Sequence, residues 1–225
     1  MELKTPTEKK LEIKTPTFET VEIFLRGAAP LVMHKFGTKV KEQMIKTQMG
    51  GDLNKGKKKR DPKDFDAVYR DAFHTAKEGW HGIPCGAFRN AAISACRTVG
   101  YKMTHAKLAF FIVADGWEEE DGTPLVRIYG TPKKHTAYAR NDNGSVDIRI
   151  RPMWDEWTAK LRVRFDADMF TTQDVLNLVM RVGMQVGLME GRPDSRNSAG
   201  QGWSTFDIVQ GAEMDKVAES MKKAA

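Results

Sequence analysis

Gly183-Met-Gln-Val-Gly-Leu-Met-Glu-Gly-Arg-Pro-Asp-Ser-Arg-Asn-Ser-Ala-Gly-Gln-Gly-Trp203 joins an amphipathic helix to a final strand. Its five glycines leave the backbone bare, and a loop that keeps this many usually needs positive φ or the close approach of another chain. Arg192, Arg196, Asn197 and Ser198 are donors among them. The stretch predicts a loop whose main chain lies against a phosphate backbone, with a flexible surface loop as the alternative.

The segments on either side of this loop show regular periodicity. Thr171 and Asp174 have the spacing of a helix cap, and residues 175–182 place Val175, Leu176, Leu178, Val179 and Val182 on an apolar face. Residues 203–209 alternate as a strand does, and residues 212–225 predict a polar terminal helix.

Two earlier stretches alternate between apolar and basic side chains. In the first, Val146, Ile148 and Ile150 alternate with Asp147, Arg149 and Arg151; in the second, Ala159, Leu161, Val163 and Phe165 alternate with Lys160, Arg162 and Arg164. We expect a pair of strands with positive charge on the faces away from the core. Because neighbouring like charges destabilise a sheet, this stripe favours a bound anion, with a solvated strand face as the alternative.

The N-terminal third begins with an extended, proline-containing arm over residues 1–17, which either is disordered or pairs with the sheet edge of a neighbouring subunit. Residues 20–26 alternate as a strand. Residues 38–48 predict a helix with Val40, Met44 and Ile45 facing inward. Residues 50–64 contain six basic and three acidic residues, a charge of +3, which indicates a solvated loop or a finger that contacts a polyanion.

The middle of the chain predicts two helices and a hairpin. A short helix is expected to pack Tyr69 and Phe73 onto the body. A longer helix starting at Pro84 has a face of small apolar side chains that extends to Val99. Residues 108–114 and 125–129 are expected to form a hairpin whose acidic tip, Asp115 and Glu118 to Asp121, is solvated. Residues 131–145 are polar and rich in turn-forming residues.

The composition is that of a water-soluble globular chain. Of 225 residues, 40% are hydrophobic and 29% charged, and the net charge of +6 favours polyanionic partners. Cys85 and Cys96 are too few for a disulfide framework or a zinc site with two cysteine pairs, which fits a reducing, cytoplasmic setting. We expect no membrane segment and no cofactor, since no phosphate-binding loop, zinc-binding or nucleophile motif is present.

The order of these elements is βαββαβ with additional strands. It predicts an α+β fold, a ferredoxin-like or modified RRM-like antiparallel sheet with insertions, which spans residues 18–210 between the arm and a tail of residues 211–225. Folds of this kind place two helices on one face of the sheet and leave the other face available, and RNA-binding domains use such a face.

Three blocks resemble the RAMP superfamily of CRISPR-associated proteins, especially the backbone subunits that coat guide RNA. They are the opening strand with Gly27-Ala28-Ala29-Pro30-Leu31, the segment from Gly82 to Ala91 with its Ile83-Pro84 pair, and the Gly187 to Gly202 loop followed by a strand. The resemblance implies binding of a single strand of RNA or DNA and assembly of many copies side by side, with or without other CRISPR-type subunits. A phage or mobile-element relative outside such complexes fits equally well.

The expected site contains cations that follow a phosphate backbone and aromatic rings that hold bases. The stacking candidates are Tyr138, Trp154 and Trp157, each of which has burial as its alternative role. The cations are Lys57, Lys58, Lys59, Arg60, Arg89, Arg97, Arg149, Arg151, Lys160, Arg162, Arg164, Arg192 and Arg196. Two further functions stay open: an endoribonuclease that uses His34 or His81, and an assembly protein that contacts no nucleic acid.

Overall fold

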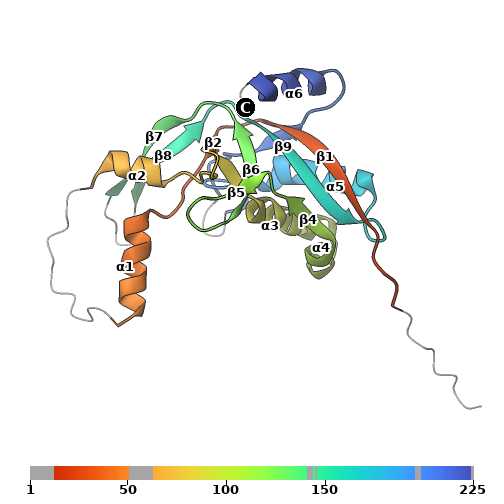
Figure 1. Ribbon diagram of the computed structural model, residues 1–225, viewed down its shortest axis with the longest axis horizontal. Helices are drawn as coiled ribbons and strands as arrows, with labels where there is room; N and C mark the ends of the chain where they lie inside the picture. Colours follow the sequence, from red (N-terminus) through yellow and green to blue (C-terminus); the bar gives the residue numbers. More distant parts are fainter. Residues whose placement is uncertain (1–12, 51–62, 141–143, 145, 196–198, 224–225) are drawn as a thin grey trace, which may run out of the picture.

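The computed structural model describes residues 13–50, 63–140, 144, 146–195 and 199–223 (Figure 1). The arm up to residue 12 and residues 51–62 of the basic insertion lie outside this range. Residues 13–17 are exposed and belong to no helix or strand, and the backbone oxygen of Thr17 accepts a hydrogen bond from the amide of Ala167 (2.7 Å). The first strand begins directly after them.

The main sheet is antiparallel, with the strand order β10-β1-β9-β6-β3; β4 also pairs with β9, and β5 with β6. These strands are β1 (Phe18–Gly27), β3 (Gly82–Pro84), β4 (Phe110–Val113), β5 (Gly116–Trp117), β6 (Pro124–Tyr129), β9 (Thr158–Asp166) and β10 (Phe206–Ile208). Helix α3 (Cys85–Cys96) precedes β4, and α5 (Thr172–Arg181) follows β9. The path β1-α3-β4-β9-α5-β10 confirms the predicted α+β, ferredoxin-like fold with insertions.

The core lies between the main sheet and the helices α3 and α5. Ile23 and Leu161 lie opposite each other on β1 and β9, and both are buried against the helices. Helix α5 begins at the predicted cap, because the amide of Asp174 donates to the Thr171 hydroxyl (3.1 Å) and the amide of Thr171 to the Asp174 carboxylate (2.9 Å). This capping box satisfies amide groups that the first helical turn leaves without partners.

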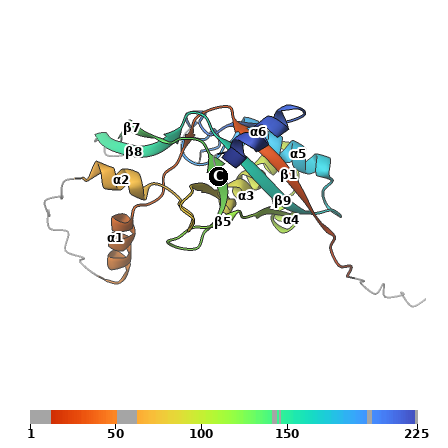
Figure 2. The same cartoon turned by 45° about the horizontal axis from the view of Figure 1, so that its top comes forward.

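A second sheet has the order β2-β8-β7, formed by β2 (Leu31–Val32), β7 (Lys133–Arg140) and β8 (Val146–Trp154). Figure 2 shows β7 and β8 side by side, next to α2 (Phe65–Asp71). Strand β7 lies within the polar, turn-rich stretch of residues 131–145, for which the sequence predicted no strand, and it pairs with β8 along its whole length. Its polar side chains suit an edge strand, where charged residues prevent pairing with other chains.

The expected pairing of the two basic strands is wrong. Strands β8 and β9 belong to different sheets, so Arg149 and Arg151 do not share a face with Lys160 and Arg162. Within β8 the first two residues of the predicted core face, Val146 and Ile148, are exposed, and residues 150–154 form the buried end. The strand continues beyond Arg151 to Trp154. This end of β8 is buried because Met153 and Trp154 pair with β2.

The predicted strand over residues 108–114 begins too early. Leu108 lies in α4 (Met103–Ala109) and is 73% exposed, and the strand starts at Phe110. Its predicted hairpin with residues 125–129 does not form, because β4 and β6 both pair with β9, one after the other along the same edge. The local hairpin joins β5 to β6 instead.

Helix α1 (Thr38–Gln48) is present, but its apolar side chains do not face inward as predicted. Val40, Met44 and Ile45 are 42%, 50% and 55% exposed, because α1 stands away from the body (Figure 1). Val99 is also exposed, since the chain leaves α3 through a 3₁₀ turn over Arg97–Val99 that turns this side chain away from the buried face.

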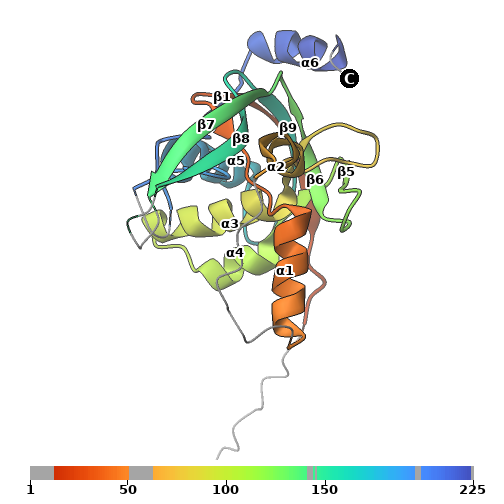
Figure 3. The same ribbon diagram turned by 90° about the vertical axis from the view of Figure 1, so that its left-hand side faces the viewer.

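The C-terminal helix was predicted correctly and is α6 (Glu213–Lys223). It lies beyond the main sheet on the side away from α3 and α4 (Figure 3). Glu213 pairs with Arg26 of β1 (2.9 Å), and Met221 is buried. Helix α6 therefore contacts the β1 edge of the face that α3 and α5 leave uncovered.

Candidate nucleic-acid interface

The face of the main sheet opposite α3 and α5 is called the open face here. Alternation along paired strands places on it the side chains that lie between the core residues. They are Phe18, Thr20, Glu22 and Phe24 of β1, Phe111 and Val113 of β4, and Lys160, Arg162 and Arg164 of β9. The structure thus brings the three predicted cations of β9 together on one surface, as the sequence indicated.

Acidic side chains neutralise two of these three cations. The ammonium group of Lys160 lies 3.3 Å from Glu22, its diagonal neighbour on β1. The guanidinium of Arg162 lies 3.0 Å from Asp115 and donates to the backbone oxygen of Ala114 (2.6 Å). The like-charge repulsion that favoured a bound anion is therefore relieved within the chain at these two positions.

Arg164 has a different environment, formed by aromatic rings. Its guanidinium lies over the ring of Phe18, 4.5 Å from the centroid, and the rings of Phe18 and Phe111 are 5.9 Å apart. Arg89 lies over Phe111 at 4.9 Å and is fixed by hydrogen bonds to the backbone oxygens of Phe110 (3.2 Å) and Lys107. Two predicted cations from distant parts of the sequence thus flank one aromatic pair, which we call the aromatic pair of the open face.

Arg151 departs most from expectation. Predicted to point away from the core, it is 4% exposed and lies 3.0 Å from Glu190 of the glycine-rich loop. Burial, aided by the nearby charge of Arg149, lowers the pKa of Arg151, against the attraction of Glu190. Arg149 precedes it on the same face of β8 and is half-buried. The structure therefore joins Arg151 to the glycine-rich loop, with Arg149 near it on β8, and places both on another sheet than the open face.

Residues 183–195 of the glycine-rich loop pack against the protein over most of their length, whereas Ala199, Gln201 and Gly202 near its end are exposed. Gly187 and Gly191 have positive φ (70° and 69°), and a Cβ on Gly191 would lie 3.1 Å from Cδ2 of Trp203. Arg192 donates to the backbone oxygen of Met189 (2.8 Å) and so closes the loop on itself. Glycine at these two positions permits the positive φ, and it leaves room for the Trp203 ring and for the loop's own backbone.

The remaining predicted cations are distributed elsewhere. Arg97 pairs with Asp194 (3.1 Å) and contacts Ser94, so it ties α3 to the loop. Lys63, at the end of the basic insertion, pairs with Asp147. The predicted residues Lys57, Lys58, Lys59, Arg60 and Arg196 lie outside the described residues.

Of the three predicted stacking residues, two are buried and one is exposed. Trp154 and Trp157 are 1% and 2% exposed and belong to the core, as their alternative role required. Tyr138 of β7 is 77% exposed. The rings that accompany arginine on the open face, Phe18 and Phe111, were not among the candidates, although alternation with Thr20 and Glu22 gave a signal for Phe18.

The two candidate histidines have different surroundings. His81 stacks on Phe73 (4.2 Å between ring centroids), accepts or donates a hydrogen bond with Thr75 (3.1 Å), and burial lowers its pKa. His34 is partly exposed and lies 4.0 Å from Glu190; burial, followed by the charge of Arg151, lowers its pKa. His81 thus serves packing, and His34 belongs to the surroundings of Arg151.

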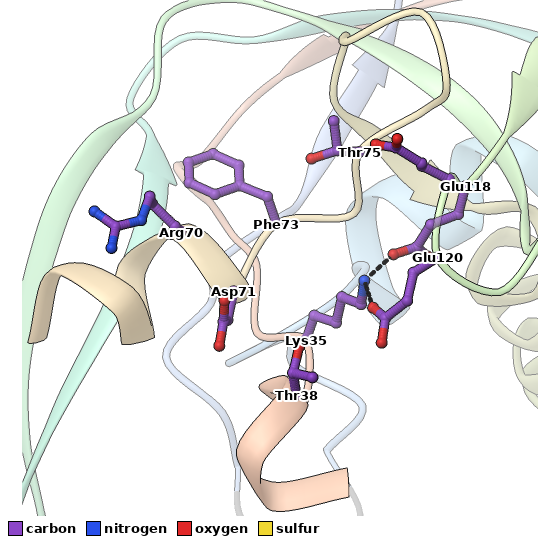
Figure 4. A pocket seen from close by; sticks show the side chains of 9 residues that line it. Lys35, Thr38, Arg70, Asp71, Phe73, Thr75, Glu118 and Glu120 are labelled. Carbon is purple, nitrogen blue, oxygen red and sulfur yellow. Dashed lines mark hydrogen bonds and ion pairs between the residues drawn. The ribbon is translucent and has the colours of Figure 1, made fainter. Parts of the chain in front are cut away.

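A polar pocket of about 320 Å³ lies between the acidic loop and the start of α1 (Figure 4). Glu118 was predicted to be solvated but is 1% exposed, where it pairs with Lys35 and with His74 (2.8 Å). Glu120 holds both Lys35 and Lys41 (2.9 Å), and these lysine contacts lower the pKa of Glu120. The ion pairs that line the pocket therefore connect the acidic loop to the start of α1.

No protein-family model matches the sequence, and no curated protein matches it. Among the helices in the described ranges, none has the length and apolar character needed to cross a bilayer. The described residues do not gather three His, Cys, Asp or Glu side chains that could hold a metal ion. Chemically, the arrangement offers cation-flanked rings on the open face and a buried arginine beside the glycine-rich loop.

Proposed function

We propose that this protein binds single-stranded nucleic acid, RNA in the first place, on the open face, without catalysing a reaction. The observation that carries the proposal is the aromatic pair Phe18 and Phe111, with Arg164 and Arg89 over its rings. Aromatic rings stack unpaired bases of any sequence, and arginines beside them contact phosphates. The fold supports the proposal, since antiparallel sheets of this plan use the same face for RNA.

Assembly in several copies along the strand is part of the proposal. Its support is the exposed apolar surface of α1, where Val40, Met44 and Ile45 face solvent in the single chain. Contiguous exposed apolar side chains mark surfaces that contact other proteins. The proposed occupant is a second copy bound to the neighbouring nucleotides.

The test is fluorescence anisotropy with a labelled single strand of RNA, and with DNA of the same sequence, over a salt series. We expect Phe18→Ala to weaken binding about 5- to 150-fold, since stacking contributes about 1–3 kcal/mol per base. Arg70→Ala is the matched control for Arg164→Ala, because Arg70 is an exposed arginine of α2 outside the open face. Sedimentation with strands of increasing length gives the number of copies bound.

Absence of binding at low salt would reject the proposal. Equal affinity of the wild type, Phe18→Ala and Arg164→Ala would move the site away from the open face. One bound copy at every strand length would reject assembly but leave binding in place.

A further inference from the structure

Two nitrogens of the Arg151 guanidinium make no hydrogen bond within the described residues. Its Nε and Nη2 atoms are buried, and neither donates a hydrogen bond of acceptable geometry to another described residue, although Glu190 Oε1 lies 3.0 Å from Nη2 as an ion pair. Buried donors in native proteins are almost always satisfied, and an unsatisfied one requires an explanation. A planar guanidinium has five donors arranged to hold an oxyanion with two parallel hydrogen bonds.

The groups around Arg151 favour a negative ligand. Arg149 lies two positions earlier on the same face of β8, and its charge acts on both Arg151 and His34. His34 approaches the cluster from the segment after β2, with Nδ1 4.0 Å from Glu190 Oε2. Glu190 is the carboxylate that pairs with Arg151, and its side chain is 34% exposed; Asp147, which pairs with Lys63, interacts with Arg149. We call His34, Arg149, Arg151 and Glu190 the loop cluster.

Glu190 is held in place by the backbone of the glycine-rich loop. Its amide donates to the backbone oxygen of Val32 (3.2 Å), and its neighbours Met189 and Gly191 both have positive φ (53° and 69°). A non-glycine residue in this conformation persists where the surrounding structure enforces it, and such residues concentrate at ligand sites. The side chain of Glu190 remains partly exposed, so it is able to rotate away while its backbone stays fixed.

We propose that the loop cluster is a binding site for a phosphate monoester, in which the ligand takes the place of the Glu190 carboxylate. Charge selects this ligand class. Exchanging a carboxylate for a phosphodiester replaces one negative charge with another, whereas a monoester brings about −1.5 to −2 at pH 7 and three acceptor oxygens. The monoester therefore leaves Arg149 and Arg151 better neutralised than Glu190 does. The terminal phosphate of a strand and a free phosphate share this chemistry.

The first experiment measures thermal unfolding with inorganic phosphate against chloride at equal ionic strength. Glu190→Gln removes the competing carboxylate, so phosphate is expected to raise the Tm of this variant more than that of the wild type. At a hundredfold excess over Kd the rise is about 5–10 °C. Glu22→Gln is the matched control, because it removes the same charge from the open face. Arg149→Gln removes a half-buried cation of the cluster and is expected to abolish the shift.

The second experiment compares the affinities of one RNA strand with a 5′-phosphate, a 3′-phosphate or hydroxyl ends. A preference of about tenfold for a phosphorylated end, which widens in Glu190→Gln and disappears in Arg149→Gln, supports a strand end as the ligand. Equal affinities together with the Tm shift support a free monoester. An equal Tm shift in all four proteins, or none in Glu190→Gln, overturns the site.

The outcome is independent of strand binding on the open face. Loss of strand affinity in Phe18→Ala with an intact phosphate shift leaves the loop cluster standing. Strand binding without any phosphate shift rejects the loop cluster and leaves the proposed function standing.

Discussion

Replacing Glu118 with glutamine tests the ion-pair network of the polar pocket. Glu118 is 1% exposed, and Lys35, whose side chain is 11% exposed, pairs with it. Removing one partner of a buried pair costs about 3–5 kcal/mol, because the other charge stays buried without compensation. Glu120 remains beside Lys35, so we expect the lower end, about 3 kcal/mol, which lowers the Tm by about 6–12 °C in a chain of this size.

The measurement is urea unfolding at pH 7.5 together with a thermal scan. Glu119→Gln is the matched control, since the adjacent Glu119 is exposed and its substitution should change stability by less than about 0.5 kcal/mol. In the double variant with Lys35→Met the loss should be smaller than the sum of the single losses by about 1–2 kcal/mol. Equal stabilities of Glu118→Gln and Glu119→Gln would refute the reasoning.

Two further changes test local structure. Thr171→Ala removes the α5 cap and is expected to cost about 1 kcal/mol in urea unfolding, whereas Thr172→Ala, one residue into the helix, serves as its control; equal losses would contradict the cap. Burial lowers the pKa of His81 from 6.5, so the unfolded chain takes up more protons as the pH falls below about 6.5, and the native state loses stability there. His81→Phe should lose less stability between pH 7.5 and 5.5 than the wild type, and an identical loss would show that His81 does not contribute.

The periodic segments of the sequence predicted the fold. Helix α5 with its Thr171 cap, helix α3 and the alternation in β1 and β9 each follow from local spacing, and their order indicated the ferredoxin-like plan. Strand β7 could not be predicted in this way, because a polar edge strand has no apolar alternation. Its pairing partner β8 determines its conformation.

The candidate site was predicted less completely, because its contacts join residues that are far apart in the sequence. Alternation gives the face of a strand but not the sheet to which the strand belongs, so Arg151 and Arg162 were placed together although they lie on different sheets. Glu118 was read from its neighbours as a solvated loop residue. Its burial depends on Lys35 and His74, which are 83 and 44 residues away in the sequence.

The ion pairs of the open face determine how salt should affect strand binding. Each phosphate contact to a single strand contributes a slope of about −0.7 to the dependence of log K on log salt concentration, because a counterion is released. Lys160 and Arg162 already hold Glu22 and Asp115, so the acidic partners take the place of counterions. If these pairs stay intact, Arg164 is the β9 cation that contributes, and the share of β9 in the slope is about −0.7. If the strand displaces Glu22 and Asp115, the slope still stays near that value, since carboxylates and not free ions are released. Glu22→Gln with Asp115→Asn should therefore steepen the share of β9 towards about −2, and an unchanged slope would place the phosphates away from β9.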